Sequence, residues 1–506
     1  MKPLFLFLLN FLIPVGVFAW GDGHRKITVE AQAILPDRAK WAAALGEKNW
    51  GWLGGVGGTT GYAGIPDMQS LYIRRPWGEC FANDYLLTRE VPFLYGYHVP
   101  DVDRTKMNQE LVGFAQRALQ ALRTETPTEA ARRIGALLHL CEDCGAPAHA
   151  GRTSPPAHTV LDNALPLDRI AVPDYQPVLL GKTDEEFFRG LVQRVGGLID
   201  FSQPIGRKLL PEATELVPFF QTDRIAEVQA RWDALAAEQV PAAVECTRVV
   251  ADTLFTLFTL GLTETRERAA LLGKVAWAPT SLFEKSGAEI LLLDARKLPG
   301  PPQSPAEIFA ACTDYSTHTD EQGAFSFHNL PEGTYRVLAY RVGSALAISD
   351  PLTLAAGKTE SPTLHLPPSE PAGNLLYNPD LQLSTYVAGM PDRWMALAPL
   401  QDGTGTYMSV LLPIPAGQKL HFGATLLDPA TKVSFLLLPQ NKLGLVQDCS
   451  RTLKLDPSFV ETARFTGQGD TGQAETPSGL PSFVLVYVQT SKPLGRAIAK
   501  LWLQTE

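Results

Sequence analysis

The sequence predicts a multidomain chain in which an all-α N-terminal domain is followed by two all-β modules of the sandwich or jelly-roll type. Three observations predict this. The chain has 506 residues, and because one hydrophobic core rarely serves so long a chain, we expect roughly two to four domains. Apolar residues recur at spacings of three and four up to about Trp277, as on one face of a helix. Beyond Glu284 the period changes to two, as in strands that bury one face.

Residues 1–19 are predicted to be a signal peptide. A basic residue at position 2 precedes an apolar run from Leu4 to Phe18, and the segment ends in small residues at the two positions that a signal peptidase reads. Cleavage after Ala19 makes Trp20 the amino terminus. No later segment is apolar and long enough to span a bilayer, so we expect no transmembrane anchor and a secreted or periplasmic protein.

Residues 20–277 are predicted to form the all-α domain. The helical spacing of apolar residues is clearest in three stretches, 112–122, 134–140 and 244–258. Glycine- and proline-rich loops lie between such stretches, among them 51–64 and 152–157. We therefore expect helices joined by long loops that are able to carry function.

The first β module is predicted at residues 285–368. The run from Ala288 to Leu293 indicates a buried strand. Two further strands are expected, one before and one after the turn from Leu330 to Gly333. The string DEQGAFSFHNLPEGTYRVLAY, residues 320–340, resembles the carboxypeptidase-regulatory-like, prealbumin-type β-sandwich family. The resemblance implies a spacer module.

The second β module is predicted at residues 374–506. Strands are expected at 420–427, 433–438 and 483–487, and the final apolar run from Ala497 to Leu503 is expected to close the sheet. The strings NLLYNPDLQ at 374–382 and PDRW at 391–394 resemble the galactose-binding-like jelly-roll modules. A glycan ligand and a purely spacing role both remain open for this module.

Composition limits the functional classes. A net charge of −9 argues against a sequence-independent grip on nucleic acid, which needs a basic track. It does not exclude cleavage of phosphodiesters, because bound zinc reverses the local field. The six cysteines are too few for a disulfide framework. Cys141 and Cys144 form a C-x-x-C pair, but no second pair follows, so we interpret them as small buried residues or as a local disulfide.

A cluster of metal-type ligands lies between positions 139 and 162. His139 and Asp143 stand four residues apart, as do His158 and Asp162, and His149 lies between the two pairs. Residues four apart on a helix lie on one face, with Cβ atoms roughly 5–6 Å apart. Each pair can therefore present an imidazole and a carboxylate to one point. A single histidine on an apolar helix face is more often a core residue, but this register of five residues predicts a zinc site.

Weaker candidates come earlier in the chain. After leader cleavage, the free amine and carbonyl of Trp20 can chelate a metal that His24 also reaches. Asp67 ends a Gly-Ile-Pro-Asp motif, in which the proline fixes the preceding backbone, and His98 supplies one more imidazole.

Together these residues resemble the superfamily of zinc-dependent phospholipases C and fungal single-strand-specific zinc nucleases, over about residues 20–275. The resemblance implies a mostly helical fold with a three-zinc cluster that hydrolyses phosphodiesters through an activated water. It also implies that Asp67 acts as the general base. The implied ligands are Asp67, His98, His139 and Asp143 for the first zinc; His149, His158 and Asp162 for the second; and Trp20, through its amine and carbonyl, His24 and the bridging Asp143 for the third.

Within this superfamily most features favour the phospholipase branch. These are the Gly-Ile-Pro-Asp motif, Ala150 directly after His149, and the short segment from there to His158. Asp162 favours the other branch, since phospholipases C use Glu there. The segment between Asp67 and His98 is longer than in either branch, and the substitutes to consider are Asp84, Asp101 and Asp103.

Two alternatives to a phospholipase C remain open. A nuclease that acts on single strands needs aromatic side chains beside the zinc ions on which a base can stack, and the available ones are Tyr62, Tyr72, Trp77 and Tyr95. The second alternative is a catalytically silent adhesion or binding protein in which metal only stabilises the fold. The expected partner is thus a phosphodiester, either a phospholipid headgroup or single-stranded nucleic acid.

Overall fold

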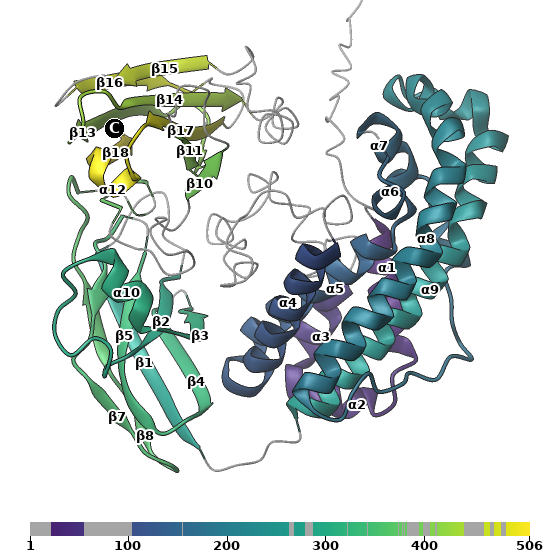
Figure 1. Ribbon diagram of the computed structural model, residues 1–506, viewed down its shortest axis with the longest axis horizontal. Coiled ribbons are helices and arrows are strands. Elements are labelled where there is room, and N and C mark those ends of the chain that lie inside the picture. The colour runs from purple at the N-terminus through teal and green to yellow at the C-terminus, as the bar shows by residue number, and fades with distance from the viewer. Residues whose placement is uncertain are drawn as a thin grey trace, which may run out of the picture.

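The computed structural model describes the helical region from residue 22 and the β region that follows it, with gaps. The described residues are 22–54, 104–153, 155–262, 268–278, 287–320, 322–341, 343–372, 374–376, 378, 380–381, 394–397, 405–409, 412–439, 460–465, 470–476 and 482–505. Helices come first and sheets follow, and the two kinds of structure occupy opposite sides of the molecule in Figure 1. The predicted fold class, an all-α domain followed by β modules, is therefore confirmed.

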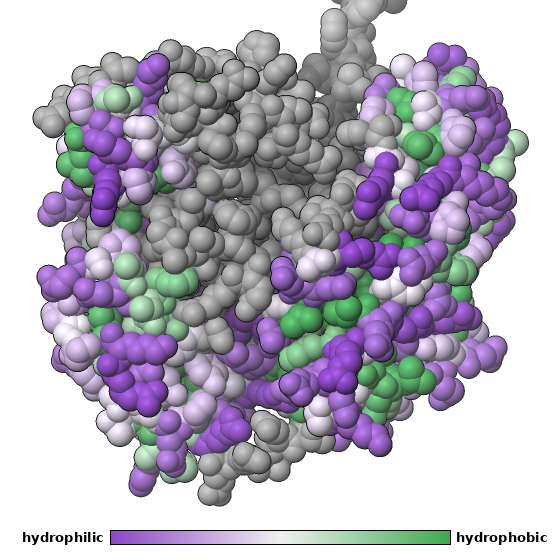
Figure 2. All heavy atoms as spheres, viewed as in Figure 1, coloured by the Kyte–Doolittle hydropathy of each residue, from purple (hydrophilic) through white to green (hydrophobic). Residues whose placement is uncertain are grey.

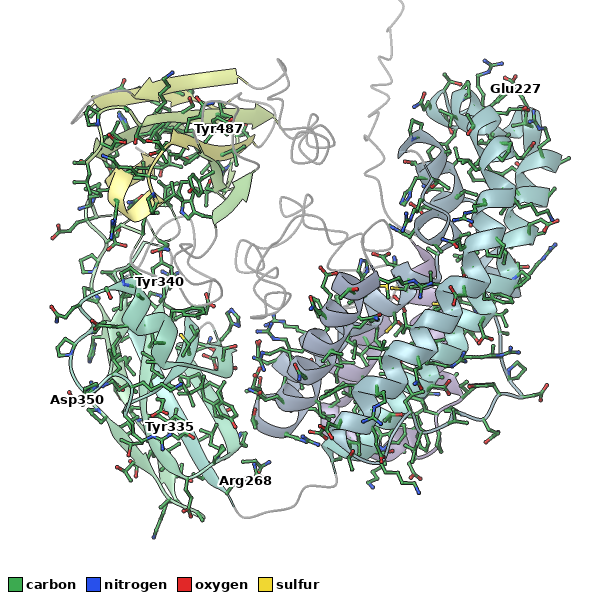
Figure 3. The ribbon with its side chains drawn as sticks, in the orientation of Figure 1. Glu227, Arg268, Tyr335, Tyr340, Asp350 and Tyr487 are labelled. Atoms are coloured by element: carbon green, nitrogen blue, oxygen red, sulfur yellow. The ribbon has the colours of Figure 1, made fainter. Side chains whose placement is uncertain are left out.

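The helical region is a bundle around one buried helix. Its elements are α1 (Asp22–Ala33), α2 (Arg38–Leu45), α3 (Glu47–Gly54), α4 (Arg104–Thr124), α5 (Pro127–Gly145), α6 (Pro147–Ala150), α7 (Pro155–Asn163), η7 (Leu167–Arg169), α8 (Asp184–Gln221), η8 (Ile225–Val228) and α9 (Gln229–Gly261). Helices α8 and α9 form a long pair that η8 joins at the tip, where Glu227 is labelled in Figure 3. No described helix is long and apolar enough to cross a membrane.

Helix α5 is the central helix of this bundle. The side chain of Thr126 caps its start by accepting a hydrogen bond from the amide of Glu129, and a proline occupies its first turn. From Ala136 to Gly145 every residue is buried, because α4, α9, α3 and α8 surround the helix. The helix ends where Ala146 precedes Pro147, since a residue before proline is disfavoured in the helical conformation.

The first β unit has two sheets, and it begins earlier than predicted. One sheet holds β1 (Ala269–Trp277), β4 (Ala324–Leu330), β8 (Thr359–Glu360) and β9 (Thr363–Leu366). The other holds β2 (Glu289–Asp294), β3 (Cys312–His318), β5 (Gly333–Tyr340), β6 (Ala347–Ile348) and β7 (Leu352–Leu354), and α10 (Pro305–Ala311) precedes β3. Because β1 pairs with β4 and β9, its residues belong to this unit, although the sequence assigned them to the helical domain.

The second β unit also has two sheets among its described residues. The larger holds β10 (Trp394–Leu397), β11 (Gly405–Ser409), β12 (Leu412–Ile414), β14 (Lys432–Pro439), β15 (Val460–Phe465) and β17 (Ser482–Thr490). The smaller holds β13 (Lys419–Leu426), β16 (Asp470–Glu475) and β18 (Ile498–Thr505), and α12 (Leu494–Ala497) leads into β18. The last apolar run of the chain does pair with a strand of its sheet, as the sequence predicts.

The two β units share a continuous apolar core. The strand β2 buries both faces: Ile290 and Leu292 pack within the first unit, and Leu291 and Leu293 pack against the second. The hydroxyl of Tyr340, which Figure 3 labels at the end of the first unit nearest the second, accepts a hydrogen bond from the amide of Asn378 at 2.5 Å.

The helical region contacts the first β unit through α4 and α5. The guanidinium of Arg117 donates to the carbonyl of Ser316 at 2.7 Å, and the amide of Asn329 donates to the carbonyl of Arg123 at 2.8 Å. On the face seen in Figure 2, the helices present mostly charged and polar side chains to solvent, with apolar side chains in patches among them.

Candidate metal centre

The described candidate ligands come from four helices that meet at one place. Helix α1 carries His24, α5 carries His139 and Asp143, α6 carries His149, and α7 carries His158 and Asp162. The short α6 begins directly after α5 because Pro147 stops one helix and starts the next, so His149 turns back beside the end of α5. All of these side chains are buried except that of His158, which is 15% exposed.

Asp143 is the point on which three imidazoles converge. The Nε2 atom of His139 lies 3.2 Å from its Oδ2. The Nε2 atoms of His24 and His149 lie 3.6 Å and 3.5 Å from its Oδ1. The His24 and His139 rings stack, with centroids 4.4 Å apart. One fully buried carboxylate thus faces three ring nitrogens from three helices.

These separations fit ligands that share metal ions. With bonds to zinc of about 2.1 Å, two ligands of a tetrahedral site lie about 3.4 Å apart. The Asp143 distances of 3.2–3.6 Å bracket that value, and they lie at or beyond the long end of an N–H···O hydrogen bond, roughly 3.2 Å. A buried carboxylate with this surrounding is a typical metal ligand, because a bound cation offsets the cost of removing the charge from water.

A second group lies next to the first. Ligand atoms of His149, His158 and Asp162 lie within 4.8 Å of one another. The rings of the two histidines meet edge to face, with centroids 4.3 Å apart. The Nε2 atom of His158 lies only 2.9 Å from Asp162, a hydrogen-bond distance. Because His149 also faces Asp143, it connects the two groups.

Glu142 is part of the site, and sequence reasoning missed it. A ligand atom of Glu142 lies within 4.8 Å of those of His24 and His139. Its Oε2 accepts a hydrogen bond from Nδ1 of His24 at 2.8 Å, and its Oε1 accepts one from the hydroxyl of Thr28 at 2.6 Å. Burial raises the pKa of Glu142, and the hydrogen bonds from His24 and Thr28 oppose that rise. The only signal in the sequence was an acidic residue inside an apolar helix.

The nearby cysteines do not belong to the candidate ligand set. Cys141 and Cys144 carry free, buried thiols on α5, so no disulfide joins them. Burial raises the pKa of both thiols. Neither thiol belongs to the two described groups whose ligand atoms lie within 4.8 Å of one another. The sequence left open whether Cys141 and Cys144 are small buried residues or form a local disulfide, and the first interpretation is correct.

The remaining predicted site residues lie outside the described residues. These are the ligands Trp20 and His98, and Asp67 as both ligand and general base; the possible substitutes Asp84, Asp101 and Asp103; and the aromatic residues Tyr62, Tyr72, Trp77 and Tyr95. Their roles stay predictions. The described candidates lie together in two adjoining groups, each of which could hold a metal ion.

Comparisons with known proteins add little to this geometry. A family model described as polysaccharide lyase family 4, domain II, matches residues 309–361, within the first β unit. This family differs from the carboxypeptidase-regulatory-like one that the sequence resembles. No curated protein matches the chain.

Two toxins are among the solved structures that resemble this chain. The alpha toxin of Clostridium absonum is 12% identical with a TM-score of 0.32, covering 66% of this chain and 99% of that one. The alpha-toxin of Clostridium perfringens is 11% identical with a TM-score of 0.24, covering 67% and 96%. A putative carbohydrate-binding protein of Bacteroides uniformis is 7% identical with a TM-score of 0.15, covering 47% and 99%. These likenesses are too slight to support a conclusion.

Proposed function

We propose that the chain is a secreted zinc-dependent phosphodiester hydrolase of the phospholipase C type. The observation that carries the proposal is the convergence of His24, His139 and His149 on the buried Asp143 at separations expected of ligands that share zinc. The adjoining group supplies a second site nearby. Two adjoining metal sites are typical of enzymes that cleave phosphoesters.

The chain's own residues have defined tasks in this proposal. Asp143, His24 and His139 would hold metal at the first group, and His149, His158 and Asp162 would hold a further ion. When bound, zinc supplies Lewis acidity toward the phosphate oxygens and lowers the pKa of water. Asp67 is proposed as the base that removes a proton from the attacking water.

A phospholipid headgroup is the proposed substrate. The Gly-Ile-Pro-Asp motif, Ala150 and the short segment from His149 to His158 support it over a nucleotide. The net charge of −9 also favours a small phosphodiester over a long polyanion. For the β region we propose a spacing role, because the two units share one core and so move together.

The test uses the mature protein, cleaved before Trp20. Zinc is counted by elemental analysis, and hydrolysis is measured on a chromogenic choline phosphodiester and on single-stranded DNA. We expect tightly bound zinc, choline ester hydrolysis, loss of activity with 1,10-phenanthroline, and recovery when zinc is returned. Hydrolysis of DNA alone would replace the phospholipase with a nuclease. Zinc without either activity would leave a metal-stabilised binding protein and refute the proposal.

A further inference from the structure

We propose that Glu142 is a positioning residue that fixes the ring of His24 for metal binding, an inference that rests on the proposed metal-dependent function. Three observations lead to it: the contacts of the two oxygens of Glu142, the orientation of the His24 ring, and the place of Thr28 on α1. None of these follows from the ligand spacing in the sequence.

The two edges of the His24 ring face two different carboxylates. Its Nδ1 donates to Oε2 of Glu142 at 2.8 Å, whereas its Nε2 lies 3.6 Å from Oδ1 of Asp143. The first separation is that of a charge-assisted hydrogen bond, and the second is that of two ligands of one metal. Because a carboxylate accepts the Nδ1 proton, the lone pair of the neutral ring lies on Nε2 and points toward Asp143.

Both oxygens of Glu142 are already used. Oε1 accepts the Thr28 hydroxyl at 2.6 Å, and Oε2 accepts His24. Thr28 and His24 stand four residues apart on α1 and so share one face of that helix. Glu142 therefore holds α1 against α5 at two points, which fixes both the position of the helix and the rotation of the ring. A carboxylate with these contacts acts beside the metal ligands, as such partners of ligating histidines commonly do.

The chain offers a matched control on the same helix. Glu129 is also a buried carboxylate of α5, and its Oε2 lies 3.3 Å from Nδ1 of a histidine, His318. Glu129 lies near the start of α5, next to the β region, whereas Glu142 lies near its end. A general effect of removing a buried Glu–His contact from α5 should appear in both Glu142→Ala and Glu129→Ala, whereas an effect on His24 should appear only in Glu142→Ala.

The experiment measures the zinc affinity of the full mature chain by competition with a chromogenic chelator. We expect Glu142→Ala to weaken the binding of one zinc about 10–100-fold, the loss usual for partners of ligating histidines. Thr28→Val should weaken zinc binding less, because Oε2 of Glu142 still accepts the hydrogen bond from His24. Glu142→Gln should retain most of the affinity, since the amide oxygen can accept from Nδ1. Glu129→Ala, the matched control for Glu142→Ala, should leave zinc affinity unchanged.

A double-mutant cycle with His24→Ala decides whether Glu142 acts through His24. If it does, Glu142→Ala should cost almost nothing further in the His24→Ala background. Additive losses would overturn the proposal, because Glu142 would then bind zinc itself or stabilise the fold independently. Equal losses in Glu142→Gln and Glu142→Ala would also overturn it. Zinc affinity is measured without substrate, so failure of hydrolysis and failure of this inference are separate results.

Discussion

Asp143 is the residue on which the site depends most. It is fully buried on α5, and its two oxygens lie within 3.6 Å of ring nitrogens from α1, α5 and α6. No other described carboxylate near the site faces three imidazoles. Removing its charge while keeping its shape therefore tests the metal assignment at a single residue.

We expect Asp143→Asn to lose bound zinc and to lower hydrolysis more than about 100-fold. This loss exceeds the one usually seen when only a hydrogen-bond partner of a metal ligand is replaced. A neutral amide oxygen is a much weaker zinc ligand than a carboxylate. Elemental analysis and the choline phosphodiester assay provide the measurements. The control is Asp252→Asn, a fully buried Asp on α9 that accepts hydrogen bonds from Tyr175 and Arg194. Its zinc content should not change; normal zinc in Asp143→Asn would refute the assignment.

At the scale of elements, a close contact between α6 and α8 positions His149. A Cβ atom added to Gly206 of α8 would lie 1.9 Å from the carbonyl oxygen of Pro147 in α6. The same atom would lie 3.0 Å from Gly151, just beyond the end of α6. Helix α6 can thus lie against α8 only because residue 206 has no side chain, and His149 is two residues beyond Pro147.

We expect Gly206→Ala to force α6 away from α8, to destabilise the fold by about 1–3 kcal/mol, and to weaken zinc binding because His149 moves. Gly197→Ala on the same helix is the control: its position is exposed and a Cβ there would meet nothing within 4 Å. Alanine should stabilise the helix there by about 1 kcal/mol. Urea unfolding and chelator competition measure both effects. Unchanged zinc affinity in Gly206→Ala would show that the contact does not position His149.

Elements differ in how far the sequence predicted them. Local signals sufficed for α5, where the four-residue spacing places His139 and Asp143 on one face. Helix α8 lies within the region predicted to be all-α, but outside the three stretches with the clearest helical spacing, and it contains Pro204, Pro211 and Pro218, residues that usually end a helix. All three lie on its exposed side, where the lost hydrogen bonds can be replaced by water. A usable signal did exist, since Thr183 caps the helix with Glu186 in the capping-box pattern.

Contacts between segments far apart in the chain could not be predicted from the sequence. Glu142 meets His24 across 118 residues, and no spacing rule relates positions so far apart. The strand β1 was assigned to the helical domain because its partners lie more than 40 residues further along the chain, beginning at β4. Pairing in three dimensions, not local periodicity, decided both cases.

For the whole molecule, the junction between the helical region and the first β unit carries charge. Glu129 on α5 is buried, and its carboxylate contacts Arg132 on α5 and His318 on β3. Burial alone would raise the pKa of Glu129, but Arg132, His318 and Arg133 outweigh it and hold the pKa at about 2. The carboxylate therefore links the helix that bears the candidate metal ligands to the sheet beside it.

This pKa makes the junction sensitive to acid. A carboxyl group whose pKa is lower in the folded state stabilises that state above its ordinary pKa of 4.5 and loses this contribution as the pH falls toward about 2. The shift corresponds to about 3 kcal/mol of unfolding free energy. Zinc ligands also gain protons in acid, so the informative quantity is the difference between the wild type and Glu129→Gln, both measured without metal. We expect a difference of about 3 kcal/mol at pH 7 that shrinks below pH 4.5 and vanishes near pH 2. A difference that does not depend on pH would mean that Glu129 stabilises the junction by packing and not by its charge.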